Sequence, residues 1–121
     1  MDAQIRILGG DGVADYIALR KWLGGERELA GRVRMIQHPP RESELGGVVD
    51  ILSVALGSGG AVAVMARSLV AWLQTRRSDV EIAIASVSGA KVILSARRVK
   101  DVDLQALLQE VRAVLPVSDE S

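Results

Sequence analysis

The chain has 121 residues, a length that suits one domain with a single hydrophobic core. Fifteen basic and fifteen acidic side chains cancel, which excludes an overall field that would attract nucleic acid or an anionic membrane. The absence of Cys excludes disulfides, thiolate metal sites and a Cys nucleophile. We expect one α+β domain over residues 1–116 and a frayed polar tail over residues 117–121. Because residues 1–8 do not run apolar as a secretory signal does, we expect a cytoplasmic protein.

The first third of the chain predicts a strand, a helix and a second strand. Apolar residues alternate along 3–8 and again along 31–37, as they do in half-buried strands. Between them, residues 13–23 predict a helix, with Asp11 as a possible N-cap and two glycines at its end. The apolar side of this helix is formed by Tyr16, Leu19, Trp22 and Leu23. The sequence from His38 to Glu44 contains two prolines and predicts a loop.

A long apolar stretch, residues 47–77, predicts a pair of packed helices. Residues 51–66 carry no charge, but a membrane-spanning helix needs about 20 apolar residues. The cluster Gly57-Ser58-Gly59-Gly60 predicts a hinge between the two helices, because each Gly costs about 1 kcal/mol relative to Ala inside a helix. One side of the second helix is expected to be buried and comprises Val62, Met65, Ala66, Leu69, Trp72 and Leu73. The opposite side carries Arg67, Ser68, Gln74 and Thr75.

The last third of the chain predicts a hairpin followed by a helix. Residues 79–86 and 91–97 alternate and are joined by a short connection. Residues 102–115 repeat apolar side chains at helical spacing, with Asp101 or Asp103 as the cap. The complete order is strand, helix, strand, helical pair, strand, strand, helix. It predicts an α+β fold with a mixed four-stranded sheet and helices mainly on one face, in which right-handed crossovers favour parallel pairing.

Groups that could perform chemistry are sparse, and we predict no catalytic, cofactor-binding or metal-binding residues. His38 is the only histidine, and neither a general base nor a metal site works from one isolated residue. Glu42 and Glu44 are loop carboxylates that we expect to be solvated. The cluster Gly9-Gly10-Asp11-Gly12 lies between a strand and a helix, as phosphate-binding loops do, but it lacks their spacing and favours a tight turn. Gly57-Ser58-Gly59-Gly60 resembles such a loop only in composition, because no strand is expected before it and no Lys follows.

The basic residues favour solvated surfaces and helix ends over a nucleic-acid site. Arg32 and Arg34 are expected on one face of the second strand, with Arg6 near them. Arg76-Arg77 follows a helix whose C-terminal dipole favours cations, and Arg97-Arg98 closes the hairpin. A nucleic-acid site would cluster these cations with exposed aromatic side chains, whereas both Trp residues lie on apolar stripes. An open sheet also has two unpaired edges, so we expect a homo-oligomer, with Arg32, Arg34 and Glu81 guarding the edges.

The remaining motifs consist of packing and turn residues and cover most of the chain. They are Ala55-Leu56-Gly57-Ser58-Gly59-Gly60-Ala61, Leu69-Val70-Ala71-Trp72-Leu73, Arg76-Arg77-Ser78-Asp79-Val80, Leu94-Ser95-Ala96-Arg97-Arg98-Val99, Trp22-Leu23, Leu29-Ala30-Gly31-Arg32-Val33 and Pro39-Pro40. In these motifs the chain resembles the effector-associated constant component family, type 1. The resemblance implies a small, non-catalytic accessory protein of actinobacterial conflict or immunity systems, encoded beside caspase-like or trypsin-like peptidases and other effectors. The family supplies no catalytic residues.

Three functions remain open from the sequence. The first is an adaptor that couples effector or peptidase proteins of one bacterial conflict system by protein–protein contact. The second is a membrane-associated component in which residues 47–73 insert into the bilayer or lie on its surface. The third is a small enzyme or ligand-binding protein that uses the loops at residues 9–12 and 38–46. We favour the adaptor, with no cofactor, no metal and no nucleic-acid partner.

Overall fold

The centre of the protein is a five-stranded antiparallel sheet. The computed structural model describes residues 2–9, 13–38, 48–76, 79–86, 89–101 and 103–115. The strands along the chain are β1 (Asp2–Leu8), β2 (Val33–His38), β3 (Val48–Ala55), β4 (Glu81–Ser86) and β5 (Lys91–Ser95). Their order across the sheet is β2-β3-β1-β4-β5, and each neighbouring pair is antiparallel. The first strand of the chain therefore lies at the centre, and β2 and β5 form the edges.

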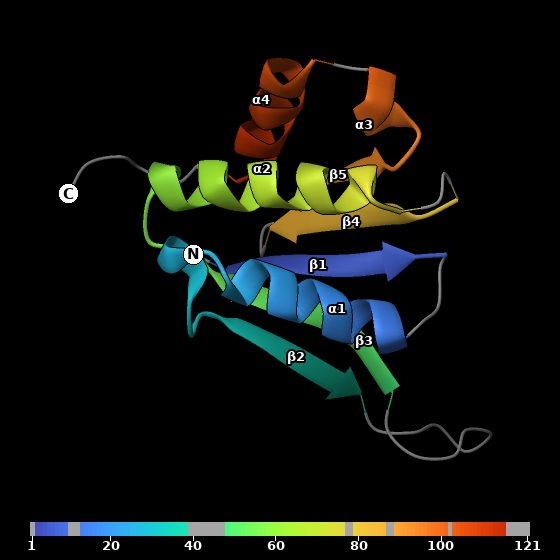
Figure 1. Cartoon of the computed structure of the whole chain (residues 1–121). Helices are drawn as coiled ribbons and strands as arrows, with labels where there is room; N and C mark the ends of the chain where they lie inside the picture. The colour runs from blue at the N-terminus through green and yellow to red at the C-terminus, as the bar shows by residue number, and fades with distance from the viewer. Residues whose placement is uncertain are drawn as a thin grey trace.

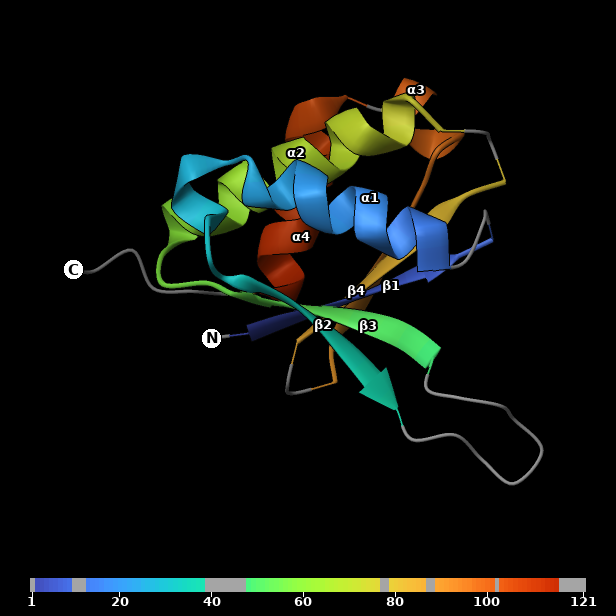
Figure 2. The same ribbon diagram turned by 60° about the horizontal axis from the view of Figure 1, so that its bottom comes forward.

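The helices of the described part of the chain cover one face of this sheet. They are α1 (Val13–Gly24), α2 (Gly59–Gln74), the short α3 (Arg98–Asp101) and α4 (Leu104–Val114), with a 3-10 turn η1 (Arg27–Leu29) after α1. Figures 1 and 2 show α1 and α2 side by side above the strands, with α3 and α4 on the same side. The predicted α+β class and the one-sided cover of helices are confirmed. The core lies between the two layers, and the described residues place no helix on the opposite face of the sheet.

The core is built from the apolar sides that the sequence pattern predicted. In α2 the six predicted core residues, Val62, Met65, Ala66, Leu69, Trp72 and Leu73, are each at most 1% exposed. In β1, Ala3, Ile5 and Ile7 are buried, while Gln4, Arg6 and Leu8 are exposed on the other face. Two predictions for the helices are wrong. Ser68 is buried, and Trp22 is 44% exposed. The indole of Trp22 lies across α2 and donates to the Ser68 carbonyl at 2.9 Å.

The predicted pair of helices over residues 47–77 is wrong in its first half, which forms strand β3 instead of a helix. The segment lacks the alternation of a half-buried strand. Leu52 and Val54 are fully buried beneath the helices, and Ile51 and Ser53 on the other face are each only 8% exposed. Burial on both faces produces an almost continuous apolar run, which the sequence pattern cannot distinguish from a buried helix. The sheet therefore has five strands, where the sequence predicted four.

The predicted parallel pairing of the first two strands of the chain is also wrong, because β3 lies between them. Since β2 is antiparallel to β3 and β3 is antiparallel to β1, β2 runs parallel to β1, as a crossover through α1 requires. However, β3 lies between them, so the two parallel strands do not pair. Glu81 was expected to guard an edge, but β4 lies between β1 and β5, so that prediction is wrong. Arg34 does lie on an edge strand, β2.

The second half of the chain follows the prediction closely. Strands β4 and β5 form the expected antiparallel hairpin, and Val80, Ile82 and Ile84 are buried on one face. Leu107, Leu108 and Val111 of α4 are buried as predicted. The predicted loop at residues 39–44, Pro116 and the tail at residues 117–121 lie outside the described residues. Among the described residues, no helix has the length and apolar character needed to cross a membrane.

Strands β1 and β3 separate after a short ladder, and a side chain of α1 fills the gap. Their pairing ends at Ile5 and Leu52, although β1 stays paired with β4 as far as Leu8. Figure 2 shows β2 and β3 turning away from β1 beyond this point. The Ile7 N–H donates to the Tyr16 hydroxyl at 2.9 Å, and this hydroxyl lies 3.5 Å from the Ile7 carbonyl oxygen. Tyr16 thus replaces the missing strand partner of Ile7.

Replacing Leu69 by Ala should lower the free energy of unfolding by about 2–5 kcal/mol, because a fully buried Leu leaves a cavity. The matched control is Arg67→Ala on the exposed side of the same helix, which should change this energy by less than about 0.5 kcal/mol. Urea unfolding in detergent-free buffer measures both variants. Similar costs for the two substitutions, or a parent protein that needs detergent, would contradict the packing of α2 described here.

Replacing Tyr16 by Phe should cost about 1–3 kcal/mol, because it leaves the buried N–H of Ile7 without its partner. Arg20→Ala, on the exposed side of α1, serves as the control and should cost less than about 0.5 kcal/mol. Urea unfolding gives the energies, and amide hydrogen exchange at Ile7 locates the effect. An unchanged exchange rate in Tyr16→Phe would show that another group satisfies Ile7.

Candidate functional site

The sequence's candidate residues for chemistry do not come together in the described part of the chain. His38 is the last residue of β2, whereas Glu42 and Glu44 lie outside the described residues. Within the described ranges, no group of three or more His, Asp or Glu side chains is placed to hold a metal ion. The two loops that a small enzyme or ligand-binding protein would use, residues 9–12 and 38–46, also lie mostly outside the described residues.

Both glycine clusters have structural roles in their described parts. Gly9 has a φ of 77°, and a Cβ at this position would lie 2.5 Å from the Asp79 carbonyl oxygen. Only Gly allows this close approach of two backbone segments. The second cluster, Gly57-Ser58-Gly59-Gly60, is not a hinge between helices, because β3 precedes it. The Ser58 hydroxyl accepts the Ala61 N–H at 3.2 Å, so this cluster caps the start of α2.

A buried polar contact joins the start of α1 to the end of α2. The Asp15 carboxylate lies 3.5 Å from an Arg76 guanidinium nitrogen. The same guanidinium stacks over the Trp72 ring, 4.3 Å from its centroid, a favourable cation–π geometry. Asp15 is only 5% exposed, which leaves no room for a substrate. The contact therefore fixes the two helices against each other.

The helix-free face of the sheet is the most distinctive surface of the described residues. Six large apolar side chains among them are substantially exposed, and three of these, Leu8, Ile36 and Ile93, lie on this face. Ile36 opposes Ile51 across β2 and β3, and Ile93 opposes Ala83 across β5 and β4. Apolar side chains thus extend over both halves of the sheet. We call this surface the open sheet face.

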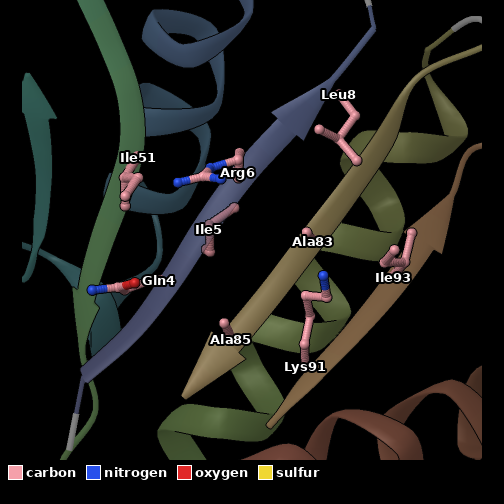
Figure 3. Close-up of a pocket in the computed structure, with 9 residues that line it drawn as sticks. All are labelled: Gln4, Ile5, Arg6, Leu8, Ile51, Ala83, Ala85, Lys91 and Ile93. Carbon is pink, nitrogen blue, oxygen red and sulfur yellow. The ribbon is translucent and has the colours of Figure 1, made fainter. Parts of the chain in front are cut away.

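An open cavity of about 290 Å³ lies in the middle of the open sheet face. Its floor is formed by Ala83 and Ala85 of β4, which are small. Taller side chains flank the floor on both neighbouring strands, as Figure 3 shows. On β1 these are Gln4 opposite Ala85 and Arg6 opposite Ala83. On β5 they are Lys91 opposite Ala85 and Ile93 opposite Ala83. The result is a trough that runs along β4 between walls on β1 and β5.

The open sheet face carries charges of both signs among the described residues. Arg6 and Lys91 line the trough, and Arg34 lies on the same face, because it opposes Ser53, which in turn opposes Gln4. All three cations are exposed, and within the described ranges none of them forms an ion pair. Two half-buried carboxylates share this face: Glu81 opposes Leu8 at one end of the trough, and Asp2 precedes Gln4 by two residues on β1 at the other end. By contrast, Arg76 and Arg98 on the helical side are paired with Asp15 and Glu110.

The sequence predicted part of this surface. It expected Arg32 and Arg34 on one face of the second strand, with Arg6 near them. The strand pairing places Arg34 and Arg6 on the same face of the sheet, on strands that are separated by β3, whereas Arg32 precedes β2. The sequence missed the contributions of Lys91, Ile93 and Leu8. The alternation of Lys91 and Ile93 with buried positions in β5 was visible in the sequence, but their position across β4 from β1 depends on the strand order. Figure 3 also shows the Arg6 side chain extending toward Ile51.

Comparison with known proteins gives a match to one protein family. The family described as Effector Associated Constant Component 1 matches residues 8–115. None of the curated proteins and none of the solved structures matches the chain. The family match runs from the last residue of β1 to the end of α4 and includes the packing and turn motifs singled out in the sequence. The protein therefore belongs to the Effector Associated Constant Component 1 family.

Proposed function

We propose that the protein is a non-catalytic accessory component that couples effector or peptidase proteins of its own system by protein–protein contact. The observation that carries this proposal is the open sheet face, with its exposed apolar side chains around a cavity and its cations, which form no ion pair within the described ranges. The family name supports an association with effectors, and the resemblance described above implies a peptidase as a partner.

The composition of the open sheet face supports a contact surface. The solvated side of an antiparallel sheet ordinarily carries polar side chains at its outward positions. Here Leu8, Ile36 and Ile93 are each about two-fifths exposed at such positions. Apolar side chains surrounded by polar and charged ones are typical of a protein interface with a polar rim. The polar rim is supplied by Asp2, Gln4, Arg6, Arg34 and Lys91.

The same surface is poorly suited to catalysis or to membrane insertion. Its polar groups include an amide, hydroxyls, cations and two half-buried carboxylates, with no nucleophile and base at hydrogen-bond distance among the described residues. In the membrane alternative, residues 47–73 supply the inserted segment. Within residues 51–73, most apolar side chains are buried in the fold instead, since β3 is an internal strand and α2 buries nine residues.

Purified protein should hydrolyse no peptide, ester or nucleotide substrate above the buffer background, because the described surface brings no nucleophile together with a general base. A panel of fluorogenic substrates measures this, with an active peptidase as the positive control. Hydrolysis that is lost in His38→Ala or Glu42→Ala would overturn the non-catalytic assignment, because these two residues are the candidate catalytic groups considered in the sequence.

Co-expressed effector or peptidase proteins of the same system should co-purify with the tagged chain, because the open sheet face offers them an apolar contact. Reversing two charges on this face, Arg6→Glu with Lys91→Glu, should reduce capture about tenfold. Reversing two charges on the helical side, Arg20→Glu with Arg67→Glu, changes the net charge equally and should leave capture unchanged. Absence of capture by the parent chain would overturn the coupling function.

Light scattering of the chain alone, before the partner is added, tests the expected homo-oligomer. The edges of β2 and β5 are the surfaces available for such self-association. A monomer at high protein concentration, unchanged by the captured partner, would contradict that expectation.

A further inference from the structure

We propose that the trough along β4 receives an amphipathic helix of the partner, with an apolar ridge seated over Ala83 and Ala85 and acidic side chains paired with Arg6 and Lys91. This inference rests on the proposed coupling function and names the chemistry of the partner segment. Three properties of the trough support it: its dimensions, its charges and its lack of aromatic side chains.

The dimensions of the trough suit the side-chain ridge of a helix. Its walls stand on β1 and β5, whose axes are about 10 Å apart at the usual strand spacing. The wall side chains occupy part of this spacing, so a helix, about 10–12 Å wide with its side chains, rests on the walls and only its ridge reaches the floor. The stretch of β4 from Glu81 to Ala85 is about 13 Å long at about 3.3 Å per residue, which equals about nine residues of helix at about 1.5 Å each. The small Ala side chains let the apolar ridge of such a helix approach the sheet.

The charges of the trough select an acidic partner. Arg6 opposes Ala83 on one wall, and Lys91 opposes Ala85 on the other, so a helix on the floor has one cation on each side. Both cations are exposed and have no ion-pair partner within the described ranges. Carboxylates of the partner would pair with them at the rim, where charges steer association and reject wrong partners. The carboxylates of Glu81 and Asp2, at the two ends of the trough, restrict these pairs to its middle.

The same charges argue against two other occupants. A second copy of this chain, packed face to face, would set three cations and two carboxylates against the same excess of cations, and juxtaposed like charges are unfavourable. A single-stranded nucleic acid stacks its bases on aromatic side chains. The described residues place no aromatic side chain on this face, since Tyr16 and Trp72 are buried and Trp22 lies on α1. An acidic amphipathic helix is the occupant that both properties favour.

Two synthetic helical peptides test the inference. Each has about 18 residues, because isolated helices shorter than about 12–15 residues are marginal in water, and each carries leucines along one side. One peptide has glutamates beside the leucines, and the other has lysines at the same positions. Fluorescence anisotropy measures the binding of labelled peptide to the full chain. The parent chain should bind the acidic peptide at least about tenfold more tightly than the basic peptide, and added salt should reduce the difference.

Charge reversal locates the contact. Arg6→Glu with Lys91→Glu should lose about tenfold in affinity for the acidic peptide and gain affinity for the basic one. The control Arg20→Glu with Arg67→Glu has the same net charge and should bind as the parent does. Far-UV circular dichroism and urea unfolding confirm that both variants are folded. Equal losses in the two variants, equal binding of both peptides, or no binding of the acidic peptide would overturn the inference.

The two proposals can fail separately. If the chain captures its effector but the charge reversal on the open sheet face leaves capture unchanged, the coupling function stands and the acidic-helix inference is wrong. If the peptides show the swapped preference but no effector is captured, the chemistry of the trough stands and the proposed class of partner is wrong. A dimer of the parent chain alone that is lost in Arg6→Glu with Lys91→Glu would assign the trough to a second copy instead.

Discussion

The central strand β1 buries Ala3, Ile5 and Ile7 beneath the helices, and the two-residue period of a strand forces Gln4, Arg6 and Leu8 onto the opposite face. This constraint determines the rest of the architecture. Because β1 pairs with β3 on one side and β4 on the other, it sets which residues of each neighbour face the core. The same pairing places Ala83 and Ala85 beside Arg6 and Gln4, so the burial of one face creates the trough on the other.

The helical layer is held in place by contacts that act on both the sheet and the helices. Leu69 and Trp72 of α2 are buried, and the Arg76 guanidinium connects α2 to Asp15 of α1. Tyr16, the next residue along α1, binds the backbone of β1 at the point where β3 leaves it. Adjacent residues of α1 thus fasten this helix to α2 and to the central strand. These contacts hold the helices on their own face of the sheet. The other face stays available for a partner.

The polar contacts and the exposed cations of this protein lie on different sides of the sheet. Its polar contacts within the described residues are concentrated in the helical layer, where they satisfy charges and backbone groups. On the open sheet face the cations lack partners within the described ranges, and apolar side chains stand exposed beside them. The proposed coupling function would use this division between a packed side and an exposed side. Rigidity matters for binding, because a preformed sheet loses little conformational entropy when a partner helix is seated on it.

Local periodicity in the sequence was sufficient to predict much of the secondary structure. The alternation at residues 3–8, the stripe of α2 from Val62 to Leu73 and the hairpin of β4 and β5 each depend on neighbours within a few residues, and each was confirmed. The prediction for residues 48–55 was wrong, because Ile51 and Leu52 are buried on opposite faces of β3, and burial on both sides removes the period of a strand. No local pattern distinguishes that run from a helix.

The open sheet face was predicted in part for a related reason. The alternation within β1 and β2 placed Arg6 and Arg34 correctly on one face. The position of Lys91 and Ile93 across Ala83 and Ala85 from β1 depends on the order β2-β3-β1-β4-β5, which joins residues about 85 positions apart in the chain. The sequence by itself therefore determined most of the helices and strands, the inward and outward sides of most of these elements, and the family. Only the tertiary structure decided the fifth strand, the strand order and the trough, because these depend on hydrogen bonds and packing between segments that are distant in the sequence.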